Sequence, residues 1–508
     1  MKMSPKSHST MKGRRSSRIL LPLLAALAAF SCSHPSDTGY FRTYIQSDPG
    51  ILDPFSSTDV VSGKILASFC DGLVRISAEG KVVGDLAESW SFDGATFSCV
   101  LRRDLRFSDG TPLSASDVVY SLTRIRDSSN PTSPRRSSYT QIASISSSDS
   151  TVTMKLSKPN MTFPYLLTQV NSYIISEKAM RERREVIGSG PFRVKSWIRD
   201  DRIVLEKNPH HSGEGAKIAG IIFRIIPEDL TARFEFMNGA LDYFELPYLS
   251  SSTFDESKFT TKLVPELCVH YVALNTSKAP FDNPEFRRAL NLAVDRQTIV
   301  ETLFSSRFSA ASGSVPPGIA GYEYTLKPYA FDPARAKKTI ARLGLSGKKL
   351  TFICKAEHQI SLAAQMIQRY LVDAGLDVEL REMEWGAMKN VTNAGRYDMA
   401  LFNWYGDYPD AENFLRPLFH SANRGSGGNR SFYSNSAFDA LVEKAALTSD
   451  AAARNRIYAQ AEELVHDDAP WIYLWYGGRR LAFSKRVSSF VPYPVYNGMK
   501  GDEIEMKP

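Results

Sequence analysis

The segments KKLTFICKA (348–356), AAQMIQRYLVDAG (363–375) and LDVELREMEW (376–385) follow one another in a chain of 508 residues. Their residue patterns predict a strand, a helix and a second strand. A strand, helix and strand in this order form an α/β unit. The second half of the chain is therefore expected to fold as an α/β domain around this unit.

Strands and helices alternate outward from this unit in both directions. The patterns predict a strand over 96–107, a capped helix over 114–127, one long amphipathic helix over 284–304 and an aromatic strand over 469–478. A Ser-rich stretch over 127–152 predicts a loop and a surface hairpin. We expect one α/β lobe over about 271–477 and a more strand-rich first lobe with an insertion. Two lobes in one chain leave a cleft between them, where ligands commonly bind.

The N-terminal segment has the pattern of an export signal. It has six basic residues and no acidic residue among positions 1–31, and Ile19 to Phe30 is an apolar run of twelve residues. Such a run is too short to span a bilayer of ~30 Å as a helix, and it is typical of a secretory signal peptide. Cys32 follows directly, as in a bacterial lipobox, so we expect lipidation at Cys32 and a polar tether over 32–37. The alternative is an ordinary signal peptide with an incidental cysteine.

Removal of this segment changes the charge balance of the chain. Six of the 62 basic residues lie within it, which leaves 56 basic residues against 55 acidic ones. A near-neutral chain gives no support to nucleic-acid binding. The remaining cysteines, Cys70, Cys99, Cys268 and Cys354, are far apart and predict neither a metal site nor a redox motif. A Cys70–Cys99 disulfide and buried free thiols both remain open.

Several segments together resemble the family 5 extracellular solute-binding proteins, the peptide-binding lipoproteins of ABC importers. The first is LAESWSFDGATFSCVLRRDLRFSDGTPLSASDVVYSLTRI (86–125). The others follow in the family's order: GSGPFRVKSW (188–197), LEKNPHH (205–211), PFDNPEFRRALNLAVDR (280–296), VPPG (315–318), FDPARAKKTIARLG (331–344), RYDMALFNWYGDYPDAENFL (396–415), NRSFYSNSAFDALVEKA (429–445) and DDAPWIYLWY (467–476). The resemblance covers nearly the whole chain after the signal segment.

The resemblance implies a two-lobed, hinged fold of the class II periplasmic-binding-protein type, with an extra domain in the first lobe. We expect a first lobe over 38–268 with a subdomain inserted at about 55–165, a second lobe over 271–477, and a return to the first lobe over 478–508. The hinge is expected near Leu267–Tyr271 and Trp475–Arg479. The implied function is the capture of di- or oligopeptides outside the cytoplasm and their delivery to a membrane permease.

The stretch FNWYGDYPDAENF (402–414) contains the main candidate site. By the resemblance, Asp407 is the carboxylate that receives the free α-amine of a bound peptide. A charge-assisted bond of this kind is worth roughly 1.5–3 kcal/mol. Trp404 and Tyr405 offer broad surfaces for varied side chains, and Gly406 allows close approach of the backbone. The alternative is that Asp407 caps a turn and Trp404 belongs to the core.

Three further residues are candidates for ligand contact. Asn429 and Tyr433 lie in the next loop. Tyr44 lies near the start of the first lobe, where it would form a wall across the cleft or, as the alternative, belong to the core. Asp410 is expected to cap the following helix. Some relatives carry an arginine just before the tryptophan for the peptide's C-terminus, but Leu401 and Asn403 carry no charge here. The C-terminus is therefore met elsewhere, or the ligand is a nickel chelate, a sugar, haem or another small solute.

An enzyme is the first alternative class of protein. The chain has no GxSxG, HExxH or Walker A motif, and its one SxxK lacks partner motifs. We expect no catalysis, no metal and no cofactor. The second alternative is a tethered sensor that uses the same cleft. We expect a monomer with a lipid anchor at the outer face of a membrane, with ABC permease subunits as partners and no nucleic acid.

Overall fold

A computed structural model describes residues 39–129, 133–246, 256–304, 308–319, 322, 325–493, 495 and 499–507. The predicted signal segment and Cys32 lie outside these residues. Among the helices that the structure describes, none is long and apolar enough to cross a bilayer.

The α/β unit predicted over 348–385 is confirmed. Strand β14 (Lys349–Lys355), helix α10 (His358–Asp373) and strand β15 (Asp377–Met383) follow in order, and the two strands pair in parallel. Strand β16 (Met399–Tyr405) lies on the other side of β14, also in parallel. The sheet has the order β11 (Tyr243–Glu245), β17 (Trp471–Phe483), β12 (Thr260–Leu274), β16, β14 and β15. The short strand β13 (Ser309–Ala310) also pairs with β17.

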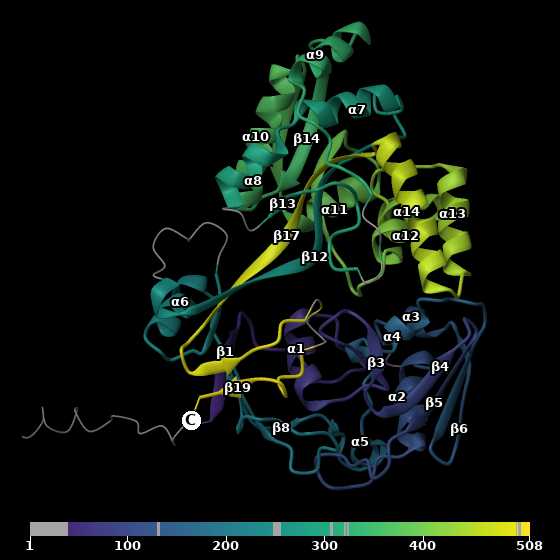
Figure 1. Cartoon of the computed structure of the whole chain (residues 1–508), viewed down its shortest axis with the longest axis vertical. Coiled ribbons are helices and arrows are strands. Elements are labelled where there is room, and N and C mark those ends of the chain that lie inside the picture. The colour runs from purple at the N-terminus through teal and green to yellow at the C-terminus, as the bar shows by residue number, and fades with distance from the viewer. Residues whose placement is uncertain are drawn as a thin grey trace, which may run out of the picture. The chain divides into compact units, whose positions relative to one another are not determined.

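Two long strands, β12 (Thr260–Leu274) and β17 (Trp471–Phe483), form the middle of this sheet and run side by side (Figure 1). Alternate residues of β12 face opposite sides, as the period of a strand requires. Val269, Tyr271 and Ala273 join one core, and Val272 and Leu274 join the other. Each of the two cores lies between one face of the sheet and the helices that cover it.

Helices cover both faces of the sheet in the second lobe. One face carries α7 (Pro284–Ala293), α8 (Arg296–Phe304), α9 (Pro333–Arg342) and α10, and the other carries α11 (Trp385–Asn393), α12 (Glu412–Phe419), α13 (Ser436–Ala446) and α14 (Ala451–Asp468). The single helix predicted over 284–304 is wrong, because the chain is extended at Val294. Asp295 then accepts a hydrogen bond from the Thr298 amide and starts α8 as a separate helix.

The first lobe is built on a four-stranded sheet of order β1-β10-β9-β8. Its strands are β1 (Tyr40–Ile45), β8 (Phe192–Ile198), β9 (Arg202–Lys207) and β10 (Gly220–Ile225), and β1 runs parallel to β10. Helix α1 (Val60–Phe69) packs on this sheet, with Ile65, Leu66 and Phe69 in its core. Helix α6 (Asp229–Met237) precedes β11 (Tyr243–Glu245), which joins the large sheet by pairing with β17.

A second four-stranded sheet lies between β1 and β8 in the chain. It has the order β4-β5-β7-β6 and is antiparallel. Its strands are β4 (Ala87–Phe92), β5 (Thr96–Leu101), β6 (Ile142–Ser148) and β7 (Thr151–Leu156), so the hairpin predicted in the Ser-rich stretch is present. A small antiparallel pair of strands, β2 (Val74–Ile76) and β3 (Val82–Gly84), precedes this sheet in the chain. Four helices belong to the same part of the chain: α2 (Ala115–Arg126), α3 (Arg136–Tyr139), α4 (Phe163–Leu166) and α5 (Glu177–Arg183).

The two long strands connect the halves of the molecule. Their register shifts between Pro265 and Val269 and again between His270 and Tyr271. These irregularities fall within the segments predicted as the hinge, where a break in regular pairing eases bending. After β17 the chain returns to the first lobe and ends in the pair β18 (Val487–Ser489) and β19 (Glu505–Met506). All four described cysteines are free and buried.

Candidate functional site

The loop that follows β16 carries the predicted site. The Gly406 amide donates a hydrogen bond of 2.7 Å to the Leu267 carbonyl, which continues the pairing of β16 with β12. The Asp407 amide donates to Oδ1 of Asn413 at 2.9 Å. The expected capping role of Asp410 is wrong in its position, because the N-cap of α12 is Ala411; Asp410 stands one residue earlier, where it accepts a hydrogen bond from the Glu412 amide and forms an ion pair with Arg454. The loop is therefore held by a bond between backbone groups at Gly406 and by the side-chain oxygens of Asn413 and Asp410 further along.

The carboxylate of Asp407 is exposed, and no side chain or amide of the described residues donates a hydrogen bond to it. Desolvation by the surrounding protein raises the pKa of this carboxyl group above its usual value, while the charge of Arg135 lowers it. An accessible carboxylate among surrounding protein atoms, with its hydrogen-bonding capacity unused, is suited to receive a cation.

The loop also contacts the first lobe. Nε2 of Gln169 donates to the Asp407 carbonyl at 3.1 Å. The ring of Tyr408 stacks on Tyr165, with 4.9 Å between ring centroids and 14° between planes. A cavity of about 590 Å³ opens beside this contact, lined by residues of both lobes that include Trp90, Tyr165, Pro409 and Arg454. Asp407 therefore lies at the boundary between the lobes.

Trp404, Tyr405 and Gly406 differ in their surroundings. Trp404 is half-buried against the core, and its Nε1 donates to the Asn413 carbonyl at 2.9 Å. Tyr405 points to the opposite face of the strand and is 51% exposed. A Cβ at Gly406 would lie 2.6 Å from Cζ of Phe414. Tyr405 is therefore the more accessible ring, and Gly406 is needed for packing as well as for approach to a ligand.

Asn429 and Tyr433 lie apart from any accessible surface, unlike their predicted role in ligand contact. Asn429 is fully buried, and its amide group bonds the carbonyls of Phe419, His420 and Tyr433. The Tyr433 hydroxyl donates to Asp468 at 2.6 Å. Their polar atoms form hydrogen bonds that hold the loops of the second lobe together. The structure therefore does not bring Asn429 and Tyr433 together with the Asp407 loop.

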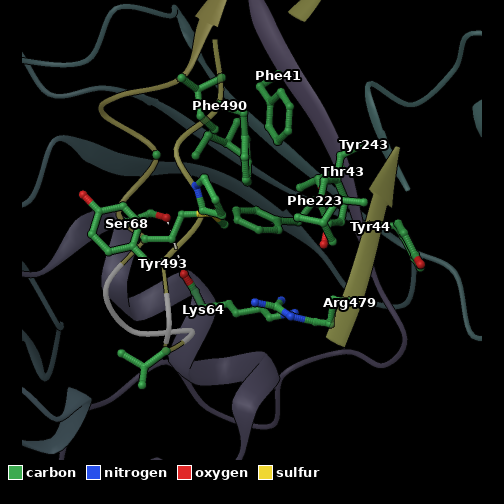
Figure 2. Close-up of a pocket in the computed structure, with 17 residues that line it drawn as sticks. Phe41, Thr43, Tyr44, Lys64, Ser68, Phe223, Tyr243, Arg479, Phe490 and Tyr493 are labelled. Carbon is green, nitrogen blue, oxygen red and sulfur yellow. Dashed lines mark hydrogen bonds between the residues drawn. The ribbon is translucent and has the colours of Figure 1, made fainter. Parts of the chain in front are cut away.

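Tyr44 lies in the first lobe and lines a separate pocket, shown in Figure 2. It is half-buried and stacks on Phe244, with 5.9 Å between the ring centroids. Three residues that make contacts across the lobe boundary were not predicted from the sequence: Tyr165, Gln169 and Tyr408. Tyr408 stands inside the quoted stretch, but its partners come from a distant part of the chain that no local pattern connects to it.

The described residues contain no group of three or more His, Cys, Asp or Glu placed to hold a metal ion. A mixed α/β fold with two lobes joined by two long strands is the architecture expected for a solute-binding protein of the periplasmic type. The chain belongs to the bacterial extracellular solute-binding proteins, family 5, whose model matches residues 81–426.

Similar proteins support this assignment over nearly the whole chain. The probable D,D-dipeptide-binding periplasmic protein DdpA of Escherichia coli (strain K12) is 31% identical over 472 residues, which cover 88% of this chain and 90% of DdpA. The glutathione-binding protein GsiB of the same strain is 29% identical and covers 94% of this chain and 96% of its own length.

Solved structures of similar proteins support the same fold. The ABC transporter-associated periplasmic binding protein DppA from Helicobacter pylori, in complex with the peptide STSA, is 26% identical with a TM-score of 0.76 over 92% of this chain and 98% of its own. HbpA2 from Haemophilus parasuis is 25% identical with a TM-score of 0.85 over 92% of this chain and 100% of its own.

Proposed function

We propose that this protein captures short peptides in the cleft between its lobes and delivers them to the permease of an ABC importer. The observation that carries the proposal is the Asp407 carboxylate, which is accessible at the lobe boundary and receives no hydrogen bond from the described residues. Relatives named for D,D-dipeptide and glutathione binding, and a similar structure in complex with the peptide STSA, support a peptide as the ligand.

The chemistry of a peptide fits a single fixed carboxylate. Peptides of varied sequence share only their backbone and their charged ends, so a receptor for many sequences must recognise these features. Asp407 would bind the α-ammonium group, and the exposed ring of Tyr405 would pack against side chains of the ligand. Tyr44 remains a candidate for the wall in the first lobe.

The proposed mechanism is hinged closure. The lobes would open where β12 and β17 lose regular pairing, near Leu267–Tyr271 and Trp475–Arg479. A ligand that contacts both lobes stabilises the closed form, since it binds that form more tightly than the open one. The proposal includes the division of the chain into lobes. The first lobe spans 38–268 with a subdomain inserted at about 55–165, the second lobe spans 271–477, and the chain returns to the first lobe over 478–508.

The proposal extends to the cell envelope. A signal segment over 1–31 and a lipidated Cys32 would tether a monomer to the outer face of a membrane, where permease subunits dock on the loaded protein. The protein itself would catalyse no reaction. Mass spectrometry of whatever copurifies with the protein separates the ligand classes. Peptides of mixed sequence support the proposal, whereas a nickel chelate, a sugar or haem would overturn it.

Replacement of Asp407 tests the site itself. Asp407→Asn should weaken binding of the tripeptide Ala-Ala-Phe at least tenfold, because the ammonium loses its charged partner and tenfold corresponds to about 1.4 kcal/mol. N-acetylated Ala-Ala-Phe should bind the wild-type protein equally poorly. Isothermal titration calorimetry measures both affinities.

The matched control is Asp377→Asn, which removes an exposed carboxylate at the start of β15 on the same lobe. This variant should bind Ala-Ala-Phe as the wild-type protein does. Unchanged affinity of the Asp407→Asn protein would contradict the assignment of Asp407.

A further inference from the structure

A short segment of the first lobe contacts the loop that carries Asp407. The ring of Tyr165, on α4, stacks on the ring of Tyr408. Nε2 of Gln169, three residues after the end of α4, donates a hydrogen bond to the backbone carbonyl of Asp407. Both contacts join a residue of the first lobe to a residue of the second, and neither uses the carboxylate of Asp407. They therefore act on the loop and leave its proposed ligand-binding group accessible.

The first-lobe side of these contacts is anchored in the core. Phe163, Leu167 and Val170 are buried at intervals of three to four residues. Tyr165 and Gln169 stand between these positions, are half-buried and reach across to the second lobe. The segment therefore presents two side chains from a fixed backbone to the Asp407 loop.

The second-lobe side is fixed to α12. The Tyr408 hydroxyl donates to the carboxylate of Glu412, and the Asp407 amide donates to Oδ1 of Asn413 at 2.9 Å. Glu412 and Asn413 are buried residues at the start of α12. Because each side of the contact is held by its own lobe, opening of the hinge must break both the stacked pair and the hydrogen bond.

A backbone hydrogen bond joins the lobes along the same boundary. The Met161 amide, two residues before α4, donates to the carbonyl of Ala446 at the end of α13, at 3.3 Å. Figure 1 shows α4 below α12 and α13, on the other side of the molecule from α6. The region around α4 is therefore a contact surface between the lobes, and Tyr165 and Gln169 are its side chains nearest to the ligand-binding loop.

We propose that Tyr165 and Gln169 are positioning residues that hold the Asp407 loop against the first lobe once a peptide is bound. This inference rests on the proposed function, namely that Asp407 receives the ammonium group of a peptide in a hinged cleft. The contacts form only when the lobes close, so they slow release of the ligand and leave its first encounter unchanged. Because they touch the loop backbone and the Tyr408 ring, they act alike on peptides of every sequence.

The test measures association and dissociation rates of Ala-Ala-Phe by surface plasmon resonance. Gln169→Ala should raise the dissociation rate about fivefold, the typical effect of one lost hydrogen bond, and leave the association rate unchanged. Tyr165→Ala should raise it to a similar extent, because a stacked ring pair is lost. Tyr165→Phe, which keeps the ring, should restore the wild-type rates. Gln46→Ala is the matched control, since this exposed glutamine bonds Asp229 within the first lobe.

The preference for a free α-amine separates this role from a merely structural one. A loop that has lost its shape would bind peptide more slowly and would lose that preference. The Gln169→Ala protein should instead keep the wild-type ratio of affinities for Ala-Ala-Phe and its N-acetylated form, since Asp407 is unchanged.

Two results would overturn this inference while the proposed function stands. One is a wild-type dissociation rate in both the Gln169→Ala and the Tyr165→Ala proteins. The other is a lower association rate with an unchanged dissociation rate. A wild-type protein without affinity for Ala-Ala-Phe would overturn the inference together with the proposed function.

Discussion

Single residues of the Asp407 loop illustrate how packing and function share one segment. Asp407 keeps its carboxylate free because its backbone, and not its side chain, holds the loop through Asn413 and Gln169. Trp404 is anchored by its indole N–H, whereas Tyr405 is left exposed. The neighbouring Gly406 allows the loop to pass over a buried ring. The position of the free carboxylate therefore depends on a glycine beside it.

Replacement of Gly406 measures this dependence. Gly406→Ala places a Cβ 2.6 Å from Cζ of Phe414, a ring that is fully buried in the core. Overpacking of this kind costs about 1–3 kcal/mol. Urea unfolding should show this loss of stability, and Gly50→Ala, where no atom lies within 4 Å of the new Cβ, should change stability little. A Gly406→Ala protein as stable as the wild type would contradict the packing argument.

At the scale of elements, the strands β12 and β17 carry the connection between the lobes. Their outer ends pair with each other, and the outer end of β17 also pairs with β11. Their inner ends are buried in the second lobe between two layers of helices. The register shifts lie between these ends. Glu266 lies at this point of β12, with one carboxylate oxygen buried and lacking a hydrogen bond among the described residues.

Glu266 should make stability depend on pH. Its folded pKa of about 7 lies above its ordinary value of 4.5 because burial disfavours the charged form. The stabilising contribution of the protonated group is complete below about pH 4.5 and is lost as the pH rises through about 7. The wild-type protein should lose up to about 3 kcal/mol relative to Glu266→Gln over this range.

Urea unfolding at pH 5 and pH 8 measures this difference between the two proteins. Glu88→Gln, which changes an exposed carboxylate on β4, serves as the matched control and should follow the wild-type protein at both values. A Glu266→Gln protein whose stability follows the wild type across the whole range would rule out this role of Glu266.

At the scale of the whole molecule, the C-terminal segment ties distant parts of the chain together. The buried Lys500 ammonium forms ion pairs with Asp71, which follows α1, and with Asp85, which precedes β4. Its bonds to the two oxygens of Asp85 measure 2.8 and 2.6 Å. The two aspartates raise the pKa of Lys500 against the effect of burial. The single ammonium group therefore offsets the charge of two carboxylates that lie inside the protein.

Loss of this lysine should destabilise the fold strongly. Lys500→Met leaves Asp71 and Asp85 buried without their main partner, which costs about 3–5 kcal/mol in comparable buried pairs. Urea unfolding of the Lys500→Met protein measures the loss. Lys507→Met, an exposed lysine seven residues further along the same segment, provides the control. Equal stability of the two variants would show that Lys500 is dispensable.

Much of the fold could be predicted from local patterns, because these depend on neighbouring residues. The α/β unit over 348–385, the hairpin in the Ser-rich stretch and the capped helix α2 follow from strand and helix periodicity together with turn residues. The single helix predicted over 284–304 is wrong, since its amphipathic pattern continues through the break. Only the extended backbone at Val294 and the cap at Asp295 separate α7 from α8.

The sequence by itself determined the alternation of strands and helices, the family resemblance and the stretch that holds Asp407, since each is written in residues close together in the chain. Only the tertiary structure decided which candidates are accessible. It buried Asn429 and Tyr433 among backbone carbonyls, stacked Tyr408 on Tyr165, and brought Lys64 beside Arg479. The physical reason is that burial and pairing depend on how segments pack in space. Tyr408 and Tyr165, like Lys64 and Arg479, come from distant parts of the chain, and no local pattern records which segments meet.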